Sequence, residues 1–312
     1  MIAFVLKFTA SLAWSSLNVV MRLLFQKGWL KTEKIPAYVI SVGNLQAGGA
    51  GKTPLVIQVA REAIQRGRTV CILSRGYGKE GSGGIISPGS SHADPREFGD
   101  EPSLIHQQVP QAWIGVSSDR IRAYREIERQ LGHAPDLVIL DDGFQHWKIA
   151  RDRDVLAVTS TRWGQGIFRD FYAASKKADL VVWSKGWVRP DWVASHSWTK
   201  IEYQVPRCMD SQRRFWLISG VADPKNVLHS VQDAGYAVVR HFAFPDHAQY
   251  SKSEAEKLIL QAEQAGTTLL MTGKDAVKWK ALGFNEKNWV SLEPQVVFRE
   301  GTEAWRRTLW GD

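Results

Sequence analysis

The chain has 312 residues, of which 44% are hydrophobic and 23% are charged, a composition typical of a globular protein with about two domains. Its net charge of +8 predicts an anionic partner, and because no DNA- or RNA-reading motif is present, nucleic acid is not an expected partner. The two cysteines, Cys71 and Cys208, form neither a disulfide framework nor a metal-ligand pair, which is typical of a reducing compartment.

Residues 1–30 are predicted to form a helix with a single polar stripe. Polar side chains recur there at spacings of three or four residues, at Lys7, Ser11, Ser15, Asn18, Arg22 and Gln26. The remaining faces are apolar, but the uncharged stretch 8–21 is shorter than the ~20 residues that span a bilayer. No signal-peptide pattern is present. The helix therefore either lies in a membrane interface or packs on the protein's own core.

A glycine-rich segment then follows a short apolar strand at 38–40 and precedes a helical pattern at 55–65. This order is typical of a loop whose backbone amides cradle phosphate groups at the start of a helix. Lys52 would reach the β- and γ-phosphates, and the Thr53 hydroxyl would ligate Mg²⁺. The candidate loop residues are Asn44, Gly48, Gly49, Ala50, Gly51, Lys52 and Thr53. Gln46 stands where the usual spacing has glycine, so a flexible turn remains the alternative.

Beyond the loop, short apolar runs alternate with helical patterns, which predicts a parallel α/β sheet. Strands are expected at 69–73, 137–140, 155–158 and 180–183, and helices at 54–66, 102–108, 120–131 and 173–177. A second α/β series begins near 215. We therefore expect a P-loop NTPase-like domain at 31–198, a linker at 199–213 and a smaller α/β domain at 214–312, whose last residues could return to the first domain.

Two carboxylates, Asp141 and Asp142, end the apolar strand at 137–140. The carboxyl edge of a parallel strand faces the crevice where ligands bind. Beside a phosphate loop, one of these carboxylates is expected to hold Mg²⁺, directly or through water. The alternative is a polar cap on a strand end.

Three further blocks are weak signals when each is taken alone. Residues 74–78 suggest a contact to an anion or a sugar, but they are equally typical of a turn. The acids at 100–101 could simply cap a helix, and His247 could be structural rather than a proton carrier.

Taken together, the blocks resemble the tetraacyldisaccharide 4'-kinase family, the lipid A 4'-kinases of Gram-negative bacteria. They are GlyAsn…GlyGly-x-GlyLysThrPro at 43–54, SerArgGlyTyrGly at 74–78, GlyAspGluPro at 99–102, AspAspGlyPheGlnHis at 141–146, PheProAspHis at 244–247 and LysAspAlaValLys at 274–278. The resemblance covers nearly the whole chain. It implies an enzyme at the cytoplasmic face of the bacterial inner membrane that uses ATP and Mg²⁺. The substrate would be a lipid A disaccharide precursor, phosphorylated at its 4' hydroxyl on an anionic membrane surface.

The resemblance also implies roles for individual residues. Asp100 matches the proposed catalytic base, His247 the histidine that supports it, and Lys52 the phosphate-binding lysine. The block around the metal comprises Thr53, Asp141, Asp142 and Gln145, and the substrate-contacting residues are Arg75, Tyr77, Gly78, Arg120, His146 and Arg169. Positive charge for the transferred phosphoryl group would come from Lys52 and from Arg169 or Arg120.

The chain departs from the family pattern in two places. The loop at 164–170 is shorter than usual and lacks a proline-glycine turn, and Gly273 replaces a glutamate. Two other functions therefore stay open: a membrane-associated P-loop hydrolase that acts as a switch on a protein partner, and a catalytically silent glycolipid-binding relative. The switch would not need the blocks that contain Asp100 and His247.

Overall fold

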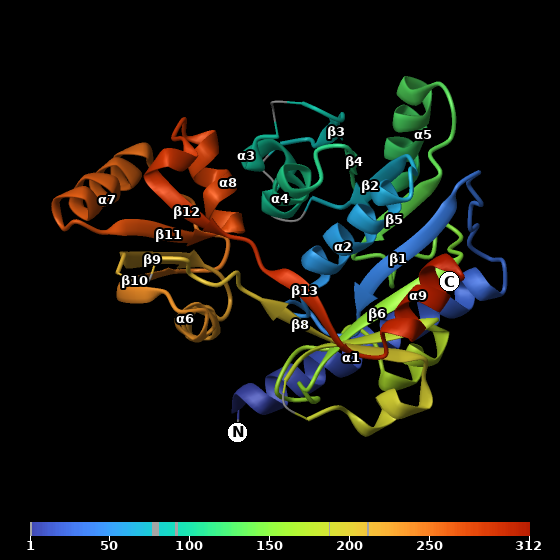
Figure 1. Cartoon of the computed structure of the whole chain (residues 1–312). Helices are drawn as coiled ribbons and strands as arrows, with labels where there is room; N and C mark the ends of the chain where they lie inside the picture. Colours follow the sequence, from blue (N-terminus) through green and yellow to red (C-terminus); the bar gives the residue numbers. More distant parts are fainter. Residues whose placement is uncertain (1, 77–80, 91–92, 187, 211) are drawn as a thin grey trace. The chain divides into compact units, whose positions relative to one another are not determined.

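The computed structural model describes residues 2–76, 81–90, 93–186, 188–210 and 212–312. The chain divides into two compact units (Figure 1). The larger unit comprises Met1–Arg75, Gln111–Glu202 and Val296–Asp312, and the smaller unit comprises Gly76–Pro110 and Tyr203–Gln295.

The grouping of residues 76–110 differs from the sequence-based expectation, which placed them in the P-loop domain. This segment contains α3 (Pro95–Phe98) and α4 (Asp100–Gln108), and both helices pack against α8 (Gly273–Ala281). The packing joins residues that lie far apart in the sequence, which local patterns do not reveal.

The larger unit is built on a mainly parallel sheet with the strand order β13-β8-β7-β6-β1-β5-β2-β4. The bounds are β1 (Tyr38–Asn44), β2 (Val70–Ser74), β4 (Trp113–Val116), β5 (Leu137–Asp141), β6 (Arg153–Thr159), β7 (Leu180–Lys185), β8 (Trp198–Gln204) and β13 (Gln295–Glu300). The central strands are almost wholly buried. This burial agrees with their unbroken apolar sequences, because a parallel sheet is covered on both faces. The predicted parallel α/β class is confirmed.

The helices of the larger unit are α1 (Ile2–Gln26), α2 (Lys52–Gln65), α5 (Arg120–Leu131) and α9 (Thr302–Trp310), with 3₁₀ turns η1 (Tyr172–Lys177) and η2 (Asp191–Ser195). Helix α2 packs on β1, β5 and β2, and α5 packs on β2 and β4. The segment at 173–177, predicted as helical, lies in the 3₁₀ helix η1, and the expected extended connectors at 199–206 and 294–299 overlap strands β8 and β13.

The register of the sheet brings the predicted motifs to one edge. In the parallel pairing of β1 with β5, Val42 lies opposite Asp141. Strand β2, which ends at Ser74, is the other neighbour of β5. The carboxyl ends of β1, β5 and β2 therefore lie side by side, with the glycine-rich loop following the first of them.

The smaller unit contains a parallel sheet with the order β10-β9-β11-β12. The strands of this sheet are β9 (Arg214–Gly220), β10 (Ala237–Phe244), β11 (Thr268–Thr272) and β12 (Trp289–Leu292). The short strand β3 (Gly84–Ile86) belongs to this unit but not to this sheet. The helices of the unit are α3, α4, α6 (Pro224–Asp233), α7 (Lys252–Gln264) and α8, with the 3₁₀ helix η3 (Glu286–Asn288). Alternation along β9 fills two cores: Trp216 and Ile218 pack with Trp279, whereas Phe215 and Leu217 pack with Val231.

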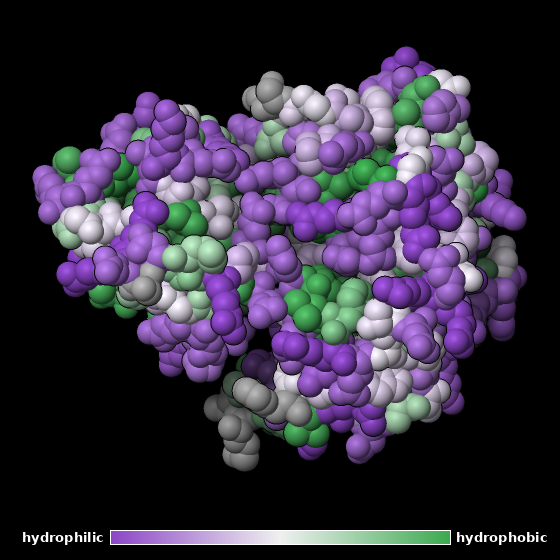
Figure 2. Space-filling model, in the orientation of Figure 1, coloured by the Kyte–Doolittle hydropathy of each residue, from purple (hydrophilic) through white to green (hydrophobic). Residues whose placement is uncertain are grey.

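Helix α1 packs on the protein with one side and exposes the other, so its contact with a membrane stays a prediction. The middle of its polar stripe, Ser11, Ser15 and Asn18, is buried within the larger unit, while Leu6 and Leu17 on other faces are 63% and 60% exposed. By length and composition, Ala3–Gln26 is apolar enough to cross a membrane, although the uncharged stretch alone is shorter. Elsewhere, the face of the molecule seen in Figure 2 is mainly hydrophilic.

Candidate active site

The glycine-rich loop joins β1 to α2 with three residues in the left-handed region. Gly48, Gly49 and Gly51 have φ values of 73°, 66° and 71°, and Gly51 directly precedes α2. Side chains are disfavoured at such φ values, so glycine allows the loop to turn there. Lys52 begins the helix, and Thr53 is buried at its second position. A glycine-rich loop that leads into the start of a helix is the arrangement that binds anions in phosphate loops.

Gly43 is required for a different reason, because a neighbouring segment approaches it closely. A Cβ at this position would lie 2.4 Å from the Phe144 Cβ and 2.7 Å from the Phe144 backbone nitrogen. The absence of a side chain thus allows the end of β1 to contact the turn that carries the paired aspartates.

Two cations meet at Asp142. The Arg169 guanidinium donates to both carboxylate oxygens of Asp142, at 2.7 and 2.8 Å, and also contacts Asn44 Oδ1. The Lys52 ammonium lies 3.6 Å from Asp142 Oδ1 and 3.4 Å from Asn44 Oδ1. The structure therefore brings together Asn44, Lys52, Asp142 and Arg169, four of the predicted residues.

The charge state of Asp142 follows from these neighbours. Burial by itself would raise the pKa of this carboxyl, but the hydrogen bonds and charge of Arg169, with Lys52 and Arg120, hold the pKa well below its usual range. The residue has φ of 51°, a conformation that is uncommon outside glycine. Asp142 is thus a fixed carboxylate in a turn that the surrounding contacts stabilise.

Asp141 and Arg120 are deeply buried beside it. Asp141 Oδ2 accepts a hydrogen bond of 2.9 Å from Ser74 Oγ, and Arg120 donates to the Asp141 carbonyl at 2.6 Å. Burial lowers the pKa of the Arg120 guanidinium, and the charge of Asp141 opposes that shift. Arg120 therefore braces the backbone of the aspartate pair in this structure, and its predicted substrate contact stays a prediction.

Gln145 and His146 follow the paired aspartates. The Gln145 amide donates to the Asn44 carbonyl at 3.0 Å and to Asp170 Oδ2 at 2.8 Å. These contacts make Gln145 a link between β1 and the loop at 164–170, and its predicted metal ligation stays a prediction. Burial, together with the positive charges of Arg120 and Arg151, lowers the pKa of His146 to about 3. His146 is therefore neutral at physiological pH.

Of the block at 74–78, the structure describes residues 74–76. Arg75 is exposed directly after β2. Tyr77 and Gly78 lie outside the described residues. The Ala50 carbonyl accepts a hydrogen bond of 2.8 Å from Ser184 on β7, which fastens the middle of the loop to the sheet.

In the smaller unit, Asp100 meets His247 and a third residue that the sequence analysis did not assign. His247 Nδ1 lies 3.0 Å from Asp100 Oδ2, and the Lys278 ammonium lies 2.9 Å from the same oxygen. Lys278 also donates to the Ala248 carbonyl. His247 has φ of 59°, so its backbone is held in an uncommon conformation. The block at 274–278 contains Lys278, and that block was the only sequence signal for its importance.

Asp275, in the block at 274–278, stabilises the backbone near the Asp100–His247 pair. Asp275 is fully buried and accepts hydrogen bonds from the Gly220 backbone, Tyr250 and Thr272. Gly273, one of the departures from the family pattern, begins α8, and a Cβ there would lie 2.8 Å from Leu104 Cδ1. A larger side chain at this position would therefore need the Leu104 side chain to move.

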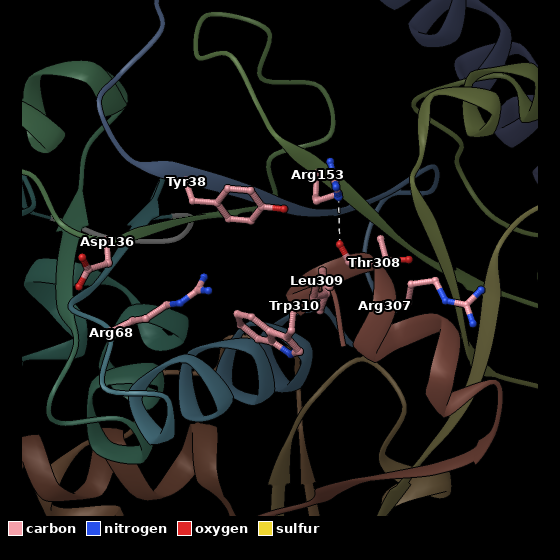
Figure 3. Close-up of a pocket in the computed structure, with 9 residues that line it drawn as sticks. Tyr38, Arg68, Asp136, Arg153, Arg307, Thr308, Leu309 and Trp310 are labelled. Atoms are coloured by element: carbon pink, nitrogen blue, oxygen red, sulfur yellow. Dashed lines mark hydrogen bonds between the residues drawn. The ribbon is translucent and has the colours of Figure 1, made fainter.

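A cavity of about 540 Å³ lies elsewhere in the larger unit. It is lined by Tyr38, Arg68, Asp136, Arg153, Arg307, Thr308, Leu309, Trp310 and Gly311, at the amino ends of β1 and β6. Figure 3 shows Arg68 directed toward the Trp310 ring, while Arg307 points away from the other arginines. The guanidinium groups do not converge, and the cavity is at the opposite end of the strands from the glycine-rich loop.

The parallel α/β fold and a glycine-rich loop that ends in Lys52 and Thr53 define a P-loop nucleotide-binding protein. A model of the tetraacyldisaccharide-1-P 4'-kinase family matches residues 3–310. The chain is 34% identical to a tetraacyldisaccharide 4'-kinase from Geobacter metallireducens, covering 82% of each chain. It is 32% identical to one from Halorhodospira halophila, covering 88% of this chain and 85% of the relative.

A solved structure agrees with these relatives. LpxK from Aquifex aeolicus, crystallised in complex with ATP, is 26% identical and superposes with a TM-score of 0.78 over 99% of this chain and 100% of the other. The chain therefore belongs to the tetraacyldisaccharide-1-P 4'-kinase family, and the resemblance read from its motifs is confirmed.

Proposed function

We propose that this chain transfers the γ-phosphate of ATP to the 4' hydroxyl of a tetraacyldisaccharide 1-phosphate, a precursor of lipid A. The contact of 3.0 Å between His247 Nδ1 and Asp100 Oδ2 carries this proposal, because a nucleotide-hydrolysing switch does not need such a pair. The names of the relatives support the same function.

On the nucleotide side, catalysis depends on positioning and positive charge. The phosphoryl transition state spreads negative charge over its equatorial oxygens. Lys52 and Arg169 are the cations at the end of the loop, and both already lie at Asp142. We infer that they bind the phosphates of ATP, with the amides of the loop 48–51 as further donors.

The donor chemistry of this region fits Mg²⁺. The hydroxyl of Thr53 and the carboxylates of Asp141 and Asp142 are the hard oxygen ligands that this ion prefers. Within the described part of the chain, no group of three or more His, Cys, Asp or Glu residues forms a metal cluster. A kinase Mg²⁺ usually has few protein ligands, completed by water and nucleotide oxygens. Bound there, the ion would neutralise charge on the phosphates.

On the acceptor side, Asp100 would take the proton of the sugar hydroxyl. Its two basic neighbours, His247 and Lys278, lie on the Oδ2 side of the carboxylate. We infer that they hold the carboxylate in place by its Oδ2, so that its Oδ1 can meet the hydroxyl. The predicted contacts to the substrate remain Arg75, Tyr77, Gly78, Arg120, His146 and Arg169.

The acceptor is amphiphilic, which gives the exposed apolar side of α1 a function. We propose that α1 places the protein on an anionic membrane surface, at the cytoplasmic face of the bacterial inner membrane, where ATP is present. Lys27 and Lys31, directly after the helix, would add attraction to anionic lipids of ~1 kcal/mol each.

The test is a transfer assay with purified protein, Mg²⁺, γ-labelled ATP and tetraacyldisaccharide 1-phosphate in detergent micelles. We expect label to appear in a bisphosphorylated glycolipid that separates from the substrate on thin-layer chromatography. Release of labelled phosphate at the same rate with and without lipid, and no labelled lipid, would instead support the hydrolase. Neither activity would support a silent glycolipid-binding protein.

A further inference from the structure

The polar stripe of α1 is bound to the segment that carries Arg169. Ser11 Oγ accepts a hydrogen bond of 2.8 Å from the Phe168 backbone, and Asn18 Nδ2 donates to the Arg169 carbonyl at 2.7 Å. One turn further on, Arg22 donates to Asp170 Oδ1 at 2.5 Å. The helix therefore holds this segment by side-chain contacts from three positions on one face, spaced by seven and four residues.

The other side of the segment is paired with the start of the glycine-rich loop. The Ala47 backbone donates to the Ile167 carbonyl and the Arg169 backbone donates to the Leu45 carbonyl, each at 2.7 Å. A short strip of backbone thus lies between α1 and the loop that precedes Lys52. A shift of α1 would therefore move the segment that carries Arg169 and the glycine-rich loop that pairs with it.

Asp170 is the charged centre of this arrangement. Its side chain is fully buried, with Oδ1 bound to Arg22 and Oδ2 bound to the amide of Gln145. Gln145 also donates to the Asn44 carbonyl, at the end of β1. A buried carboxylate requires a compensating charge and satisfied hydrogen bonds, and Arg22 supplies that charge from α1.

We propose that Asn18 and Arg22 are positioning residues for phosphoryl transfer, which act by holding Arg169 at the glycine-rich loop. The proposal rests on the proposed function and adds a second task to α1: the same helix that offers an apolar side to the membrane supports the nucleotide site. The reason is geometric, since a cation that stabilises a transition state must be held within a fraction of an ångström of its working position.

The two tasks lie on different sides of one helix and can be separated by substitution. Asn18 and Arg22 contact the segment that carries Arg169, whereas Leu17 is 60% exposed. Arg22→Met and Asn18→Leu keep the size of the side chain and remove its polar contacts. Arg22→Lys keeps the charge, and Leu17→Ser is the matched control on the apolar side.

The experiment compares these full-length variants in two assays. The first measures kcat and KM for ATP with tetraacyldisaccharide 1-phosphate in micelles, and the second measures flotation with vesicles that contain phosphatidylglycerol. For Arg22→Met and Asn18→Leu we expect kcat to fall about 10-fold or more, as for other supporting residues, with flotation unchanged. Arg22→Lys should recover part of the loss. Leu17→Ser should reduce flotation and leave KM for ATP unchanged.

A double variant tests whether Arg22 acts through Arg169. If it does, Arg22→Met combined with Arg169→Met should be little worse than Arg169→Met alone. Wild-type kcat in folded Arg22→Met and Asn18→Leu would overturn the proposal, as would additive losses in the double variant. If Arg22→Met does not fold, Asn18→Leu, which removes no charge, decides the question.

A measurement of ATP binding tests the positioning role even if the protein is not a lipid kinase. If the wild-type protein transfers no phosphate to the lipid, binding of a fluorescent ATP analogue is measured in the same variants. Weaker binding in Arg22→Met but not in Leu17→Ser would support the positioning role without the kinase. Equal binding in both would overturn it.

Discussion

The Lys278 ammonium lies 2.9 Å from the Asp100 carboxylate, and both side chains are almost completely buried, at 4% and 8% exposure. The pair joins α8 to the first residue of α4 within the smaller unit. A buried ammonium is stable only with a partner of opposite charge, and here it has Asp100 and the Ala248 carbonyl.

Removal of this ammonium should be costly for stability. We expect Lys278→Met to lower the free energy of unfolding by about 3 kcal/mol or more, because the Asp100 carboxylate loses a buried counter-charge. Urea unfolding measures the change. The matched control is Lys274→Met on the same helix, whose ion pair with Glu101 is more exposed and should cost less than about 1 kcal/mol. Equal losses in the two variants would contradict this account of the buried pair.

Lys52 should be essential for phosphoryl transfer. Its ammonium lies at the end of the loop beside Asp142, and we expect Lys52→Ala to lower kcat by at least ~10², the usual cost of losing a positioned cation. Steady-state kinetics with the glycolipid measure the loss, and circular dichroism checks the fold. Lys257→Ala, at an exposed position of α7, is the control and should retain activity. A loss of only a few-fold for Lys52→Ala would contradict the phosphate-loop assignment.

Asp100 and His247 should behave as one unit. We expect Asp100→Ala to lower kcat by ~10²–10⁴ with little change in ATP affinity, since a general base acts on the acceptor hydroxyl. His247→Ala should cost less. The double variant should be little worse than Asp100→Ala alone, because the histidine works through the carboxylate. A comparable loss of ATP affinity in Asp100→Ala would point to a metal ligand, and additive losses would separate the two roles.

His146 should make stability depend on pH in the acid range. Its pKa is about 3 in the folded protein, below the ordinary value of 6.5, because of burial and the nearby arginines. The unfolded chain therefore binds a proton at higher pH than the folded one. The stability that the neutral ring provides is complete above pH 6.5 and is lost progressively as the pH falls toward 3.

The comparison of wild type with His146→Gln isolates this contribution. We expect the urea midpoint of the wild type to fall more steeply between pH 6.5 and 4 than that of the variant, which has no titrating group at this position. Identical slopes would show that the histidine is protonated in the folded protein. A wild-type slope shallower than that of the variant would instead mean that the pKa of His146 is raised in the folded protein.

Much of the larger unit could be predicted from local patterns. Unbroken apolar runs identify the central strands, and Gly51-Lys52-Thr53 after β1 identifies the phosphate loop, because both depend on residues adjacent in sequence. Strands β8 and β13 could not be recognised in this way. Their residues alternate only partly between buried and exposed positions, which is also typical of an extended connector.

Other features depend on contacts between distant segments. The spacing from Lys7 to Gln26 determined that α1 has a polar stripe, but the partner of that stripe, the segment around Arg169, is known only from the fold. The block at 274–278 is visible in the sequence, whereas the contact of Lys278 with Asp100 requires α8 to pack on α4. The sequence by itself determined the elements and the candidate residues. Tertiary structure decided which charges are buried together, because a buried charge is stable only where folding brings its counter-charge within contact.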